Sequence, residues 1–458
     1  MAGITRPTSL QKCEFLILTL LAIQLVIVGI ANSSNENQVS PSTNVSAPIR
    51  EHFVSVSRRG DPPKIPNGEE DAHFQGSGTD RPKLPLPSFD MNFTSDLSNI
   101  WDDSAVLPQW MKDYFAWHRH QRSQITRENW KQYRFCIMRC LDSDSHCGGA
   151  ADRIKTVPLI LYWAARSKRI LMIYWSRPTA LEAFLLPPEG GVDWRVPDWM
   201  VEDAVHGRPT GNVDNLPERF HEGNDATAIT TKLQSYNGGS LFYNQNVEGP
   251  RFETIFHDMW RTMFTPTMPI QNVIQQHLER FNLTPGEYVA AHVRGRYGKI
   301  VWRDKVLFRV TENAINCASN MRPEGPIYFA SDSKAVVDHV VEKLAPQKPT
   351  KIVALTRDYE PLHLDKASNW SDRNASEFYD VFVDLYLISL SRCVTYNIGG
   401  FGEWALWMSR YSSCAVRHGK DRHPVLPCNW TGVATPDYSK PPVNIPTFLP
   451  PMAAVKLE

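Results

Sequence analysis

The sequence predicts an α/β protein whose head contains two doubly wound, Rossmann-like domains that face a shared cleft. In the first half, a strand, a glycine-rich turn, a helix and a second strand follow one another between residues 133 and 175. In the second half, the order strand, glycine or serine turn, and helix occurs three times between residues 288 and 409. This alternation is typical of parallel sheets with helices on their faces. An apolar leader and a polar stem precede the head.

The overall charge gives no sign of a highly charged partner. Lysine and arginine together number 49 in the 458 residues, and so do aspartate and glutamate. The balance favours no nucleic acid as a partner, and any anion site has to be local. The length is enough for two or three domains, each with its own core.

The leader comprises residues 15–31, FLILTLLAIQLVIVGIA, which carry no charged side chain. Arg6 and Lys12 precede it, and no basic cluster follows it. Because basic flanks stay in the cytosol, we expect a cytosolic tail at 1–14 and a lumenal remainder. We predict an uncleaved signal anchor in the membrane of the endoplasmic reticulum or Golgi, with single-pass type II topology. The segment is short for a span, so a cleaved signal peptide is the alternative.

Glycosylation sequons and cysteines are consistent with a lumenal head. Seven asparagines fit the acceptor pattern N-x-[ST]: Asn32, Asn44, Asn92, Asn282, Asn369, Asn374 and Asn429. Seven of the eight cysteines follow the leader. In an oxidising compartment they can pair, and their odd number leaves at least one free or paired between chains.

Residues 32–100 are rich in Asn, Ser, Pro and Gly, and we predict that they form a disordered stem. The head begins near residue 101 with a helix predicted over Asp113–Gln132. His118 and His120 lie two positions apart on that helix, without a partner at ligand spacing. We therefore interpret both as surface histidines and not as metal ligands.

The first domain is predicted at 101–285, on the acceptor side of the cleft. Strands are expected at Tyr133–Cys140 and Ile170–Trp175, with a helix at Ile154–Arg166 between them. The glycine turn before that helix would offer backbone N–H groups to an anion, although turns need glycine in any case. Pro158 lies late for a helix start and is expected to kink the helix. Further elements are predicted as short strands at Thr230–Gln234 and Ser240–Tyr243 and helices at Ile255–Phe264 and Ile270–Phe281.

The second domain is predicted at 286–432, followed by a Pro-rich tail at 433–458. Its first strand, Tyr288–Val293, ends in the basic loop RGRYGK. Open α/β sheets bind ligands at this end of their strands, and arginine forks pair with phosphate oxygens. A solvated basic turn is the alternative. The remaining predicted elements are helices at Val310–Asn320, Lys334–Leu344, Ser376–Ser391 and Glu403–Ser409 and strands at Pro326–Ala330, Lys351–Leu355 and Val394–Asn397.

Two common classes of nucleotide-binding protein are disfavoured. The chain has no G-x-G-x-x-G followed by an acidic residue about 20 positions later, as a dinucleotide dehydrogenase would have, and it has no P-loop.

Four segments, in order, resemble the motifs of the GDP-fucose-dependent fucosyltransferase superfamily, of the O-fucosyltransferase-like and α-1,2- and α-1,6-fucosyltransferase type. They are CGGAADRIKTVPLILYWAARSKRILMIYWSRP at 147–178, AAHVRGRYG at 290–298, YFASDS at 328–333 and FVDLYLISLSRCVTYNIGGFGEWA at 382–405. The resemblance implies a GT-B-like fold with a donor-nucleotide domain at 286–432. It also implies GDP-fucose as co-substrate without a further cofactor, and a glycan or glycoprotein acceptor.

The resemblance assigns roles to residues of the four segments. Arg294 matches the arginine that pairs with the departing diphosphate and is the implied catalytic residue. The implied nucleotide-sugar-binding set is Gly148, Gly149, Asp152, Arg153, His292, Arg294, Asp332, Ser333, Gly400 and Phe401. Two positions depart from the pattern, since Arg296 replaces a usual glycine and Asp152 stands where some members carry asparagine. Arg296 and Lys299 are weaker candidates for the diphosphate.

The expected chemistry is sugar transfer with inversion and without a metal ion. Negative charge develops on the leaving diphosphate, and a fixed guanidinium offsets it. A D-x-D tripeptide, the usual metal signature of transferases, occurs at Asp142–Asp144, but it precedes the glycine turn and does not end a strand in the basic site. The general base stays unassigned, with Asp152 and Glu403 as the nearest acids.

Two other functions are open from the sequence. One is a transferase that uses another nucleotide sugar, and the other is a non-catalytic lumenal glycan-binding protein of the same fold. Five tryptophans are candidates for sugar stacking, although a core position is the usual alternative for such residues: Trp163, Trp175, Trp194, Trp199 and Trp404.

Overall fold

A computed structural model describes most of the head. The described residues are 99–144, 147–206, 228–232, 252–297, 300–301, 304–364, 373–410, 414–420 and 423–430. All of them belong to the compact unit Gly78–Glu458. The predicted tail 1–14, anchor 15–31, stem up to residue 98 and Pro-rich tail 433–458 lie outside the described residues. No helix in the described part of the chain is long and apolar enough to cross a membrane.

The first sheet has β1 (Phe135–Cys140) at its centre, with β2 (Ile170–Trp175) and β4 (Ala228–Lys232) parallel on either side. All six residues of β1 are buried. Alternate residues enter different apolar clusters, because successive side chains of a strand point to opposite faces. The strands predicted around β1, β2 and β4 are therefore confirmed within two residues, while the strand predicted at 240–243 lies outside the described residues.

The helix predicted at 154–166 is two helices. α3 (Ala150–Ile154) starts directly after the glycine turn, and α4 (Val157–Arg166) follows after a short break. Pro158 lies in the first turn of α4, where a missing N–H costs nothing and the fixed φ is favourable. Pro158 thus begins a helix and does not kink one.

Three helices of the first half correspond to predicted ones with shifted ends: α2 (Gln109–Gln124), α8 (Phe252–Met263) and α9 (Met268–Phe281). The helix predicted to run to residue 132 ends at 124, and the separate η1 (Trp130–Gln132) follows it. The remaining elements were not predicted: η2 (Leu181–Ala183), α5 (Asp198–Ala204) and the short antiparallel pair β3 (Leu185–Leu186) and β5 (Thr265–Pro266).

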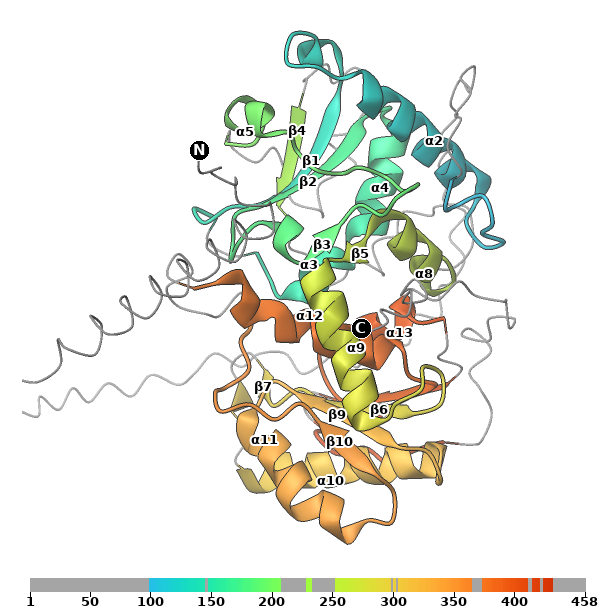
Figure 1. Cartoon of the computed structure of the whole chain (residues 1–458), viewed down its shortest axis with the longest axis vertical. Helices are drawn as coiled ribbons and strands as arrows, with labels where there is room; N and C mark the ends of the chain where they lie inside the picture. The colour runs from blue at the N-terminus through green and yellow to red at the C-terminus, as the bar shows by residue number, and fades with distance from the viewer. Residues whose placement is uncertain are drawn as a thin grey trace, which may run out of the picture. The chain divides into compact units, whose positions relative to one another are not determined.

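The second sheet has five parallel strands in the order β10-β9-β6-β11-β12, of which β6, β9 and β10 are labelled in Figure 1. The strands are β6 (Val289–Val293), β9 (Ile327–Ser331), β10 (Ile352–Ala354), β11 (Cys393–Tyr396) and β12 (Cys414–Arg417). In order of appearance this is 3-2-1-4-5, the order of a doubly wound sheet, and it reverses between β6 and β11. The prediction of an α/β fold with parallel sheets is confirmed. The domain boundaries stay predictions.

Helices connect these strands. They are α10 (Asp304–Met321), α11 (Lys334–His339) with its π-helical extension η4 (Val340–Leu344), η5 (Ala345–Gln347), η7 (Ala375–Phe378), α12 (Tyr379–Ser389) and α13 (Phe401–Met408), and a hairpin of β7 (Arg296–Tyr297) and β8 (Ile300–Val301) follows β6. The edge strand β12 was not predicted, because its four residues mix small and charged side chains.

One apolar cluster contains residues of both sheets. Trp260 of α8 donates its indole N–H to the Tyr386 hydroxyl of α12 at 3.1 Å and packs edge-on against Trp404 of α13 at 5.3 Å. Such aromatic contacts bury large areas and satisfy their polar atoms at the same time. The two halves of the head are therefore joined by a shared core.

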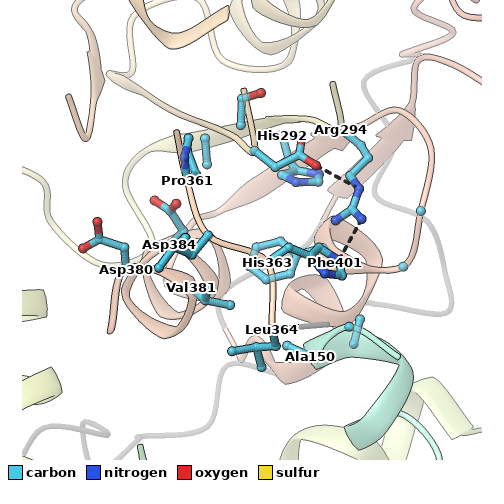
Figure 2. Close-up of a pocket in the computed structure, with 18 of the residues that line it drawn as sticks. Ala150, His292, Arg294, Pro361, His363, Leu364, Asp380, Val381, Asp384 and Phe401 are labelled. Atoms are coloured by element: carbon cyan, nitrogen blue, oxygen red, sulfur yellow. Dashed lines mark hydrogen bonds and ion pairs between the residues drawn. The ribbon is translucent and has the colours of Figure 1, made fainter. Parts of the chain in front are cut away.

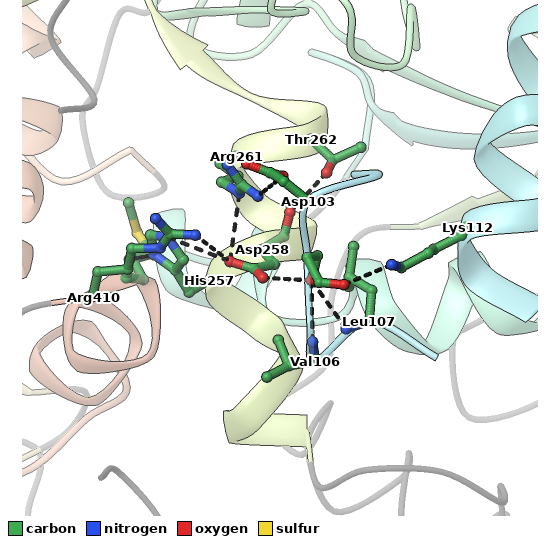
Figure 3. A network of polar contacts seen from close by, with 11 residues as sticks. Asp103, Val106, Leu107, Lys112, His257, Asp258, Arg261, Thr262 and Arg410 are labelled. Atoms are coloured by element: carbon green, nitrogen blue, oxygen red, sulfur yellow. Dashed lines mark hydrogen bonds and ion pairs between the residues drawn. The ribbon is translucent and has the colours of Figure 1, made fainter. Parts of the chain in front are cut away.

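A buried polar network adds a second link (Figure 3). Asp258 of α8 accepts a hydrogen bond from the Ser104 hydroxyl at 2.5 Å and pairs with Arg261 at 3.4 Å and with Arg410 at 3.5 Å. Lys112 of α2 donates to the Ser104 carbonyl at 2.6 Å. The network ties the start of the head to α8 and to the segment after α13.

Three disulfides form between described cysteines: Cys140–Cys147, Cys317–Cys428 and Cys393–Cys414. The odd cysteine is Cys136, whose thiol is buried and has its pKa raised to about 12 by that burial. Of the seven sequon asparagines, Asn282, Asn374 and Asn429 are exposed, and the other four lie outside the described residues.

The interpretation of His118 as a surface residue is wrong. It is fully buried on the inner stripe of α2, and its Nε2 lies 2.8 Å from the Leu171 carbonyl oxygen of β2. Burial lowers the pKa of His118 to about 4. The helical spacing with Met111, Tyr114 and Phe115 places it on the apolar face. Its Nε2 contacts one backbone carbonyl, and its Nδ1 has no hydrogen-bond partner among the described residues.

This burial predicts acid sensitivity. The unfolded chain binds a proton at His118 below about pH 6.5, whereas the folded chain does so only near pH 4. Stability is therefore present above pH 6.5 and lost as the pH falls toward 4, by up to about 1.4 kcal/mol per pH unit. In urea unfolding across this range, His118→Gln should flatten the loss, whereas the exposed His423→Gln should not. An unchanged slope in His118→Gln would contradict the assignment.

Candidate functional site

A cavity of about 430 Å³ lies at the carboxyl ends of β6, β9 and β11 and is closed on the other side by α3 (Figure 2). It therefore lies where the strand order of the second sheet reverses, the position at which open α/β sheets bind ligands. The charged residues that line it are Lys155, Arg294, Arg357, Arg417, Asp152, Asp332, Glu377, Asp380, Asp384 and Glu403.

Arg294 follows β6 directly, and its guanidinium is held at two points. Its Nε lies 3.1 Å from Oδ2 of Asp332, and its Nη2 lies 2.9 Å from Nε2 of His363. The other carboxylate oxygen of Asp332 accepts from the backbone N–H groups of Gly295 at 2.7 Å and Arg296 at 3.2 Å. One aspartate thus fixes both the arginine side chain and the turn that carries it.

Asn397, the first residue after β11, fixes the backbone of Arg294. Its Oδ1 accepts from the Arg294 N–H at 2.7 Å, and its Nδ2 donates to the Arg294 carbonyl at 3.2 Å. The side chain continues the pairing of β6 with β11 for one residue beyond Tyr396 and His292. The sequence prediction placed Asn397 inside a strand and gave it no role. The signal available in the sequence was an asparagine at the end of an apolar strand and just before a Gly-Gly turn.

His292, the fourth residue of β6, lies under the start of α13. Burial lowers its pKa to about 3, so it is neutral at physiological pH. Its ring lies 5.2 Å from that of Phe401, and a Cβ on Gly402 would approach its Nδ1 to 3.1 Å. Within the described residues, that Nδ1 has no hydrogen-bond partner.

Only part of the glycine turn before α3 lines the cavity. Gly149 and Asp152 line it, and Asp152 accepts from the Gly149 N–H at 3.3 Å. Gly148 has a φ of 77°, the left-handed region that favours glycine, and lies outside the lining. Lys155, which lies in the first motif segment but was given no role, pairs with Asp152 at 3.0 Å, and its Nζ lies 3.8 Å from the point where a Cβ of Gly400 would be.

The environment of Arg153 differs from that expected of a residue that binds the nucleotide sugar. It is fully buried, stacks over Trp175 at 4.6 Å and donates to the carbonyls of Gly148, Arg177 and Leu364. It lies outside the cavity lining, where it supports the glycine turn.

In the second half, Asp332, Gly400 and Phe401 line the cavity, whereas Ser333 does not. Ser333 packs against Gly295, where an added Cβ would lie 2.9 Å from that of the serine. Arg296 is exposed and 3.6 Å from Glu360, and Lys299 lies outside the described residues. The nucleotide-binding roles of the whole predicted set stay predictions.

An acidic wall lies opposite Arg294. Asp380 and Asp384 of α12 pair with Arg357 at 2.5 Å and 3.0 Å, and the Tyr328 hydroxyl donates to Asp384 at 2.5 Å. Burial raises the pKa of Asp384, and Arg357 opposes that rise. Burial alone would lower the pKa of Arg357, but the two carboxylates raise it. Asp380 and Asp384 lie one turn apart on α12, but no role was predicted for them, because Arg357 and Tyr328, which pair with them, lie on other segments.

The D-x-D aspartate Asp144 and the candidate tryptophans lie outside the cavity lining. Asp144 of the D-x-D tripeptide is buried and accepts from the Leu141 N–H at 2.9 Å. Trp163, Trp175, Trp194 and Trp404 are buried, Trp199 is half-buried, and none of the five lines the cavity. Among the described residues, no group of three or more His, Cys, Asp or Glu side chains is arranged to hold a metal ion.

No protein-family model and no curated protein matches the chain. The chain is similar to fucosyltransferases of known structure. A mutant of Arabidopsis thaliana FUT1 in complex with GDP is 13% identical, with a TM-score of 0.48 over 70% of this chain and 81% of that one. The α-1,6-fucosyltransferase NodZ soaked with GDP-fucose is 17% identical, with a TM-score of 0.39 over 60% and 93%. POFUT1 in complex with GDP is 10% identical, with a TM-score of 0.37 over 61% and 98%.

The contacts of Asn397 predict a local effect of its removal. Asn397→Ala leaves the buried Arg294 N–H without its acceptor, so the free energy of unfolding should fall by about 1–3 kcal/mol. Hydrogen exchange of the 292–296 segment should also become faster. Asn316→Ala is the matched control, because its side chain makes one exposed contact to Lys348 and should change stability by less than about 0.5 kcal/mol. Equal protection of 292–296 in Asn397→Ala and wild type would contradict the role.

Proposed function

We propose that this protein is a glycosyltransferase that moves fucose from GDP-fucose to a hydroxyl group of a glycan or glycoprotein. The observation that carries the proposal is the guanidinium of Arg294, held at two points inside a cavity at the reversal of the strand order. Its Nη1 edge has no role in those two contacts and can take a phosphate oxygen. The four sequence segments that resemble the superfamily support the same assignment.

In this proposal, Arg294 binds the diphosphate and offsets the charge that develops on it as the sugar leaves. Two further cations line the same cavity. Lys155 lies at the end of α3, and Arg417 is the last residue of β12. The first backbone N–H groups of α13 follow Gly400, and a helix amino-terminus favours an anion. These cations would stabilise the leaving group without a metal ion, and transfer would proceed with inversion.

The guanine base is assigned to the acidic wall. Its Watson–Crick edge carries N–H donors, which pair with carboxylate oxygens. Asp332, which the resemblance places near the guanosine, is occupied by Arg294 and its turn. Asp380 and Asp384, which line the cavity and pair with Arg357, would offer the acceptors instead. The acceptor hydroxyl needs a base, for which Asp152 and Glu403 are the acids at the α3 and α13 sides of the cavity.

The proposal includes a GT-B-like arrangement of two Rossmann-like domains, a type II membrane anchor and a lumenal head in the endoplasmic reticulum or Golgi. Three disulfides and three exposed sequon asparagines support an oxidising, glycosylating compartment. The basic flank before the apolar leader supports the orientation.

Isothermal titration of the purified full-length chain with GDP, UDP and GDP-fucose, with and without EDTA, tests the proposal. We expect guanine-selective binding that survives EDTA and that Arg294→Ala weakens by about 100-fold or more, since it loses charge-assisted hydrogen bonds to the diphosphate. Arg166→Ala is a control, because Arg166 lies on α4 outside the cavity lining.

Each alternative function predicts a different result. Preference for UDP, or loss of binding in EDTA, would indicate a transferase for another nucleotide sugar. The absence of any nucleotide binding would contradict the enzyme assignment and favour the glycan-binding protein.

A further inference from the structure

The segment Pro361–Leu364, here called the strap, contacts both halves of the head at the cavity. It follows β10, and all four of its residues line the cavity. The Leu364 carbonyl accepts from Arg153 of α3 at 3.3 Å, and His363 contacts Arg294 at 2.9 Å. Figure 2 shows His363 between Arg294 and the end of α3 that carries Ala150. None of the four sequence motifs includes the strap.

The contact with Arg294 defines the state of His363. A guanidinium has only donors, so Nε2 of His363 has to accept the hydrogen bond, and the imidazole has to be neutral with its proton on Nδ1. Asp332 holds Nε of Arg294, and His363 holds Nη2. Two points of contact on one planar group fix its orientation, and Nη1 takes part in neither of these contacts.

We propose that His363 is a positioning residue for Arg294. Its neutral imidazole holds the guanidinium in the orientation that receives the diphosphate, and it joins this arginine to the glycine turn of the other half. The inference rests on the proposed function, because it assumes that Arg294 is the group that binds the ligand.

Gly149 supplies independent support. A Cβ added to Gly149 would lie 2.9 Å from both Cε1 and Nε2 of His363, which is closer than real Cβ contacts allow. The φ of Gly149 is −69°, which any residue adopts, so backbone conformation does not require glycine here. A side chain at position 149 would therefore have to displace the imidazole of His363 from its contact with Arg294.

The first experiment compares His363→Leu with His363→Gln in the full-length chain, by titration with GDP. Leucine cannot accept a hydrogen bond, so GDP binding should weaken about 10- to 100-fold, the effect of one hydrogen bond to a charged group. Glutamine offers a carbonyl acceptor and should stay within about threefold of wild type. His206→Leu, an exposed histidine at the end of α5, is the matched control and should bind as wild type does.

The second experiment is a double-mutant cycle between Gly149→Ala and His363→Ala, measured by the urea midpoint of unfolding without ligand and by GDP affinity. If the imidazole excludes the Cβ, Gly149→Ala should shift both measurements in the wild type and neither in His363→Ala. If Gly149 is needed only for a close approach of the ligand to its backbone, GDP affinity should fall equally in both backgrounds.

The outcomes separate the two proposals. If the wild type binds GDP and His363→Leu binds it equally or more tightly, the role of His363 is overturned and the proposed function stays intact. An additive cycle, or a His363→Gln variant as weak as His363→Leu, would also overturn it. No GDP binding by the wild type would overturn the proposed function and the role of His363 with it, while the urea cycle would still decide whether the imidazole excludes the Cβ.

Discussion

The ion pair between Asp332 and Arg294 is the interaction on which the candidate site depends. The two residues end adjacent parallel strands, β6 and β9, so the sheet itself sets their distance. Asp332 also accepts from two backbone N–H groups of the turn after β6, and Asn397 at the end of β11 holds the same turn from the other side. Three strand ends therefore determine where one guanidinium lies, and His363 determines how it is turned.

The charges of the cavity are arranged in pairs. Lys155 pairs with Asp152, Arg294 with Asp332, and Arg357 with Asp380 and Asp384. Half-buried cations of this kind would repel one another without such partners, and each carboxylate also fixes the geometry of its cation. A bound diphosphate would meet cations that are already oriented and partly desolvated, which makes their interaction with its charge stronger than it would be in water.

Much of the fold could be predicted from the sequence, because buried parallel strands are continuous apolar runs. β1, β2, β6, β9 and β11 were recognised in this way, whereas the short edge strand β12 was not. His118 was misjudged because the two histidines were tested for metal-ligand spacing and not for their position relative to the apolar face of the helix. Arg294 was recognised as a site residue because it follows a strand directly. His363 was missed because it lies outside the four recognised segments and only the topology brings it to Arg294. Lys155, Asp384 and Asn397 lie inside those segments, but their contacts with the site follow only from the folded structure.

A crystal structure of the protein with GDP would show whether Arg294 binds the diphosphate. We expect the diphosphate within hydrogen-bond distance of the Arg294 guanidinium, the guanine next to Asp380 and Asp384, and the contact between Asp332 and Arg294 unchanged. GDP bound elsewhere on the head, or bound in this cavity with its phosphates away from Arg294, would contradict this role of Arg294.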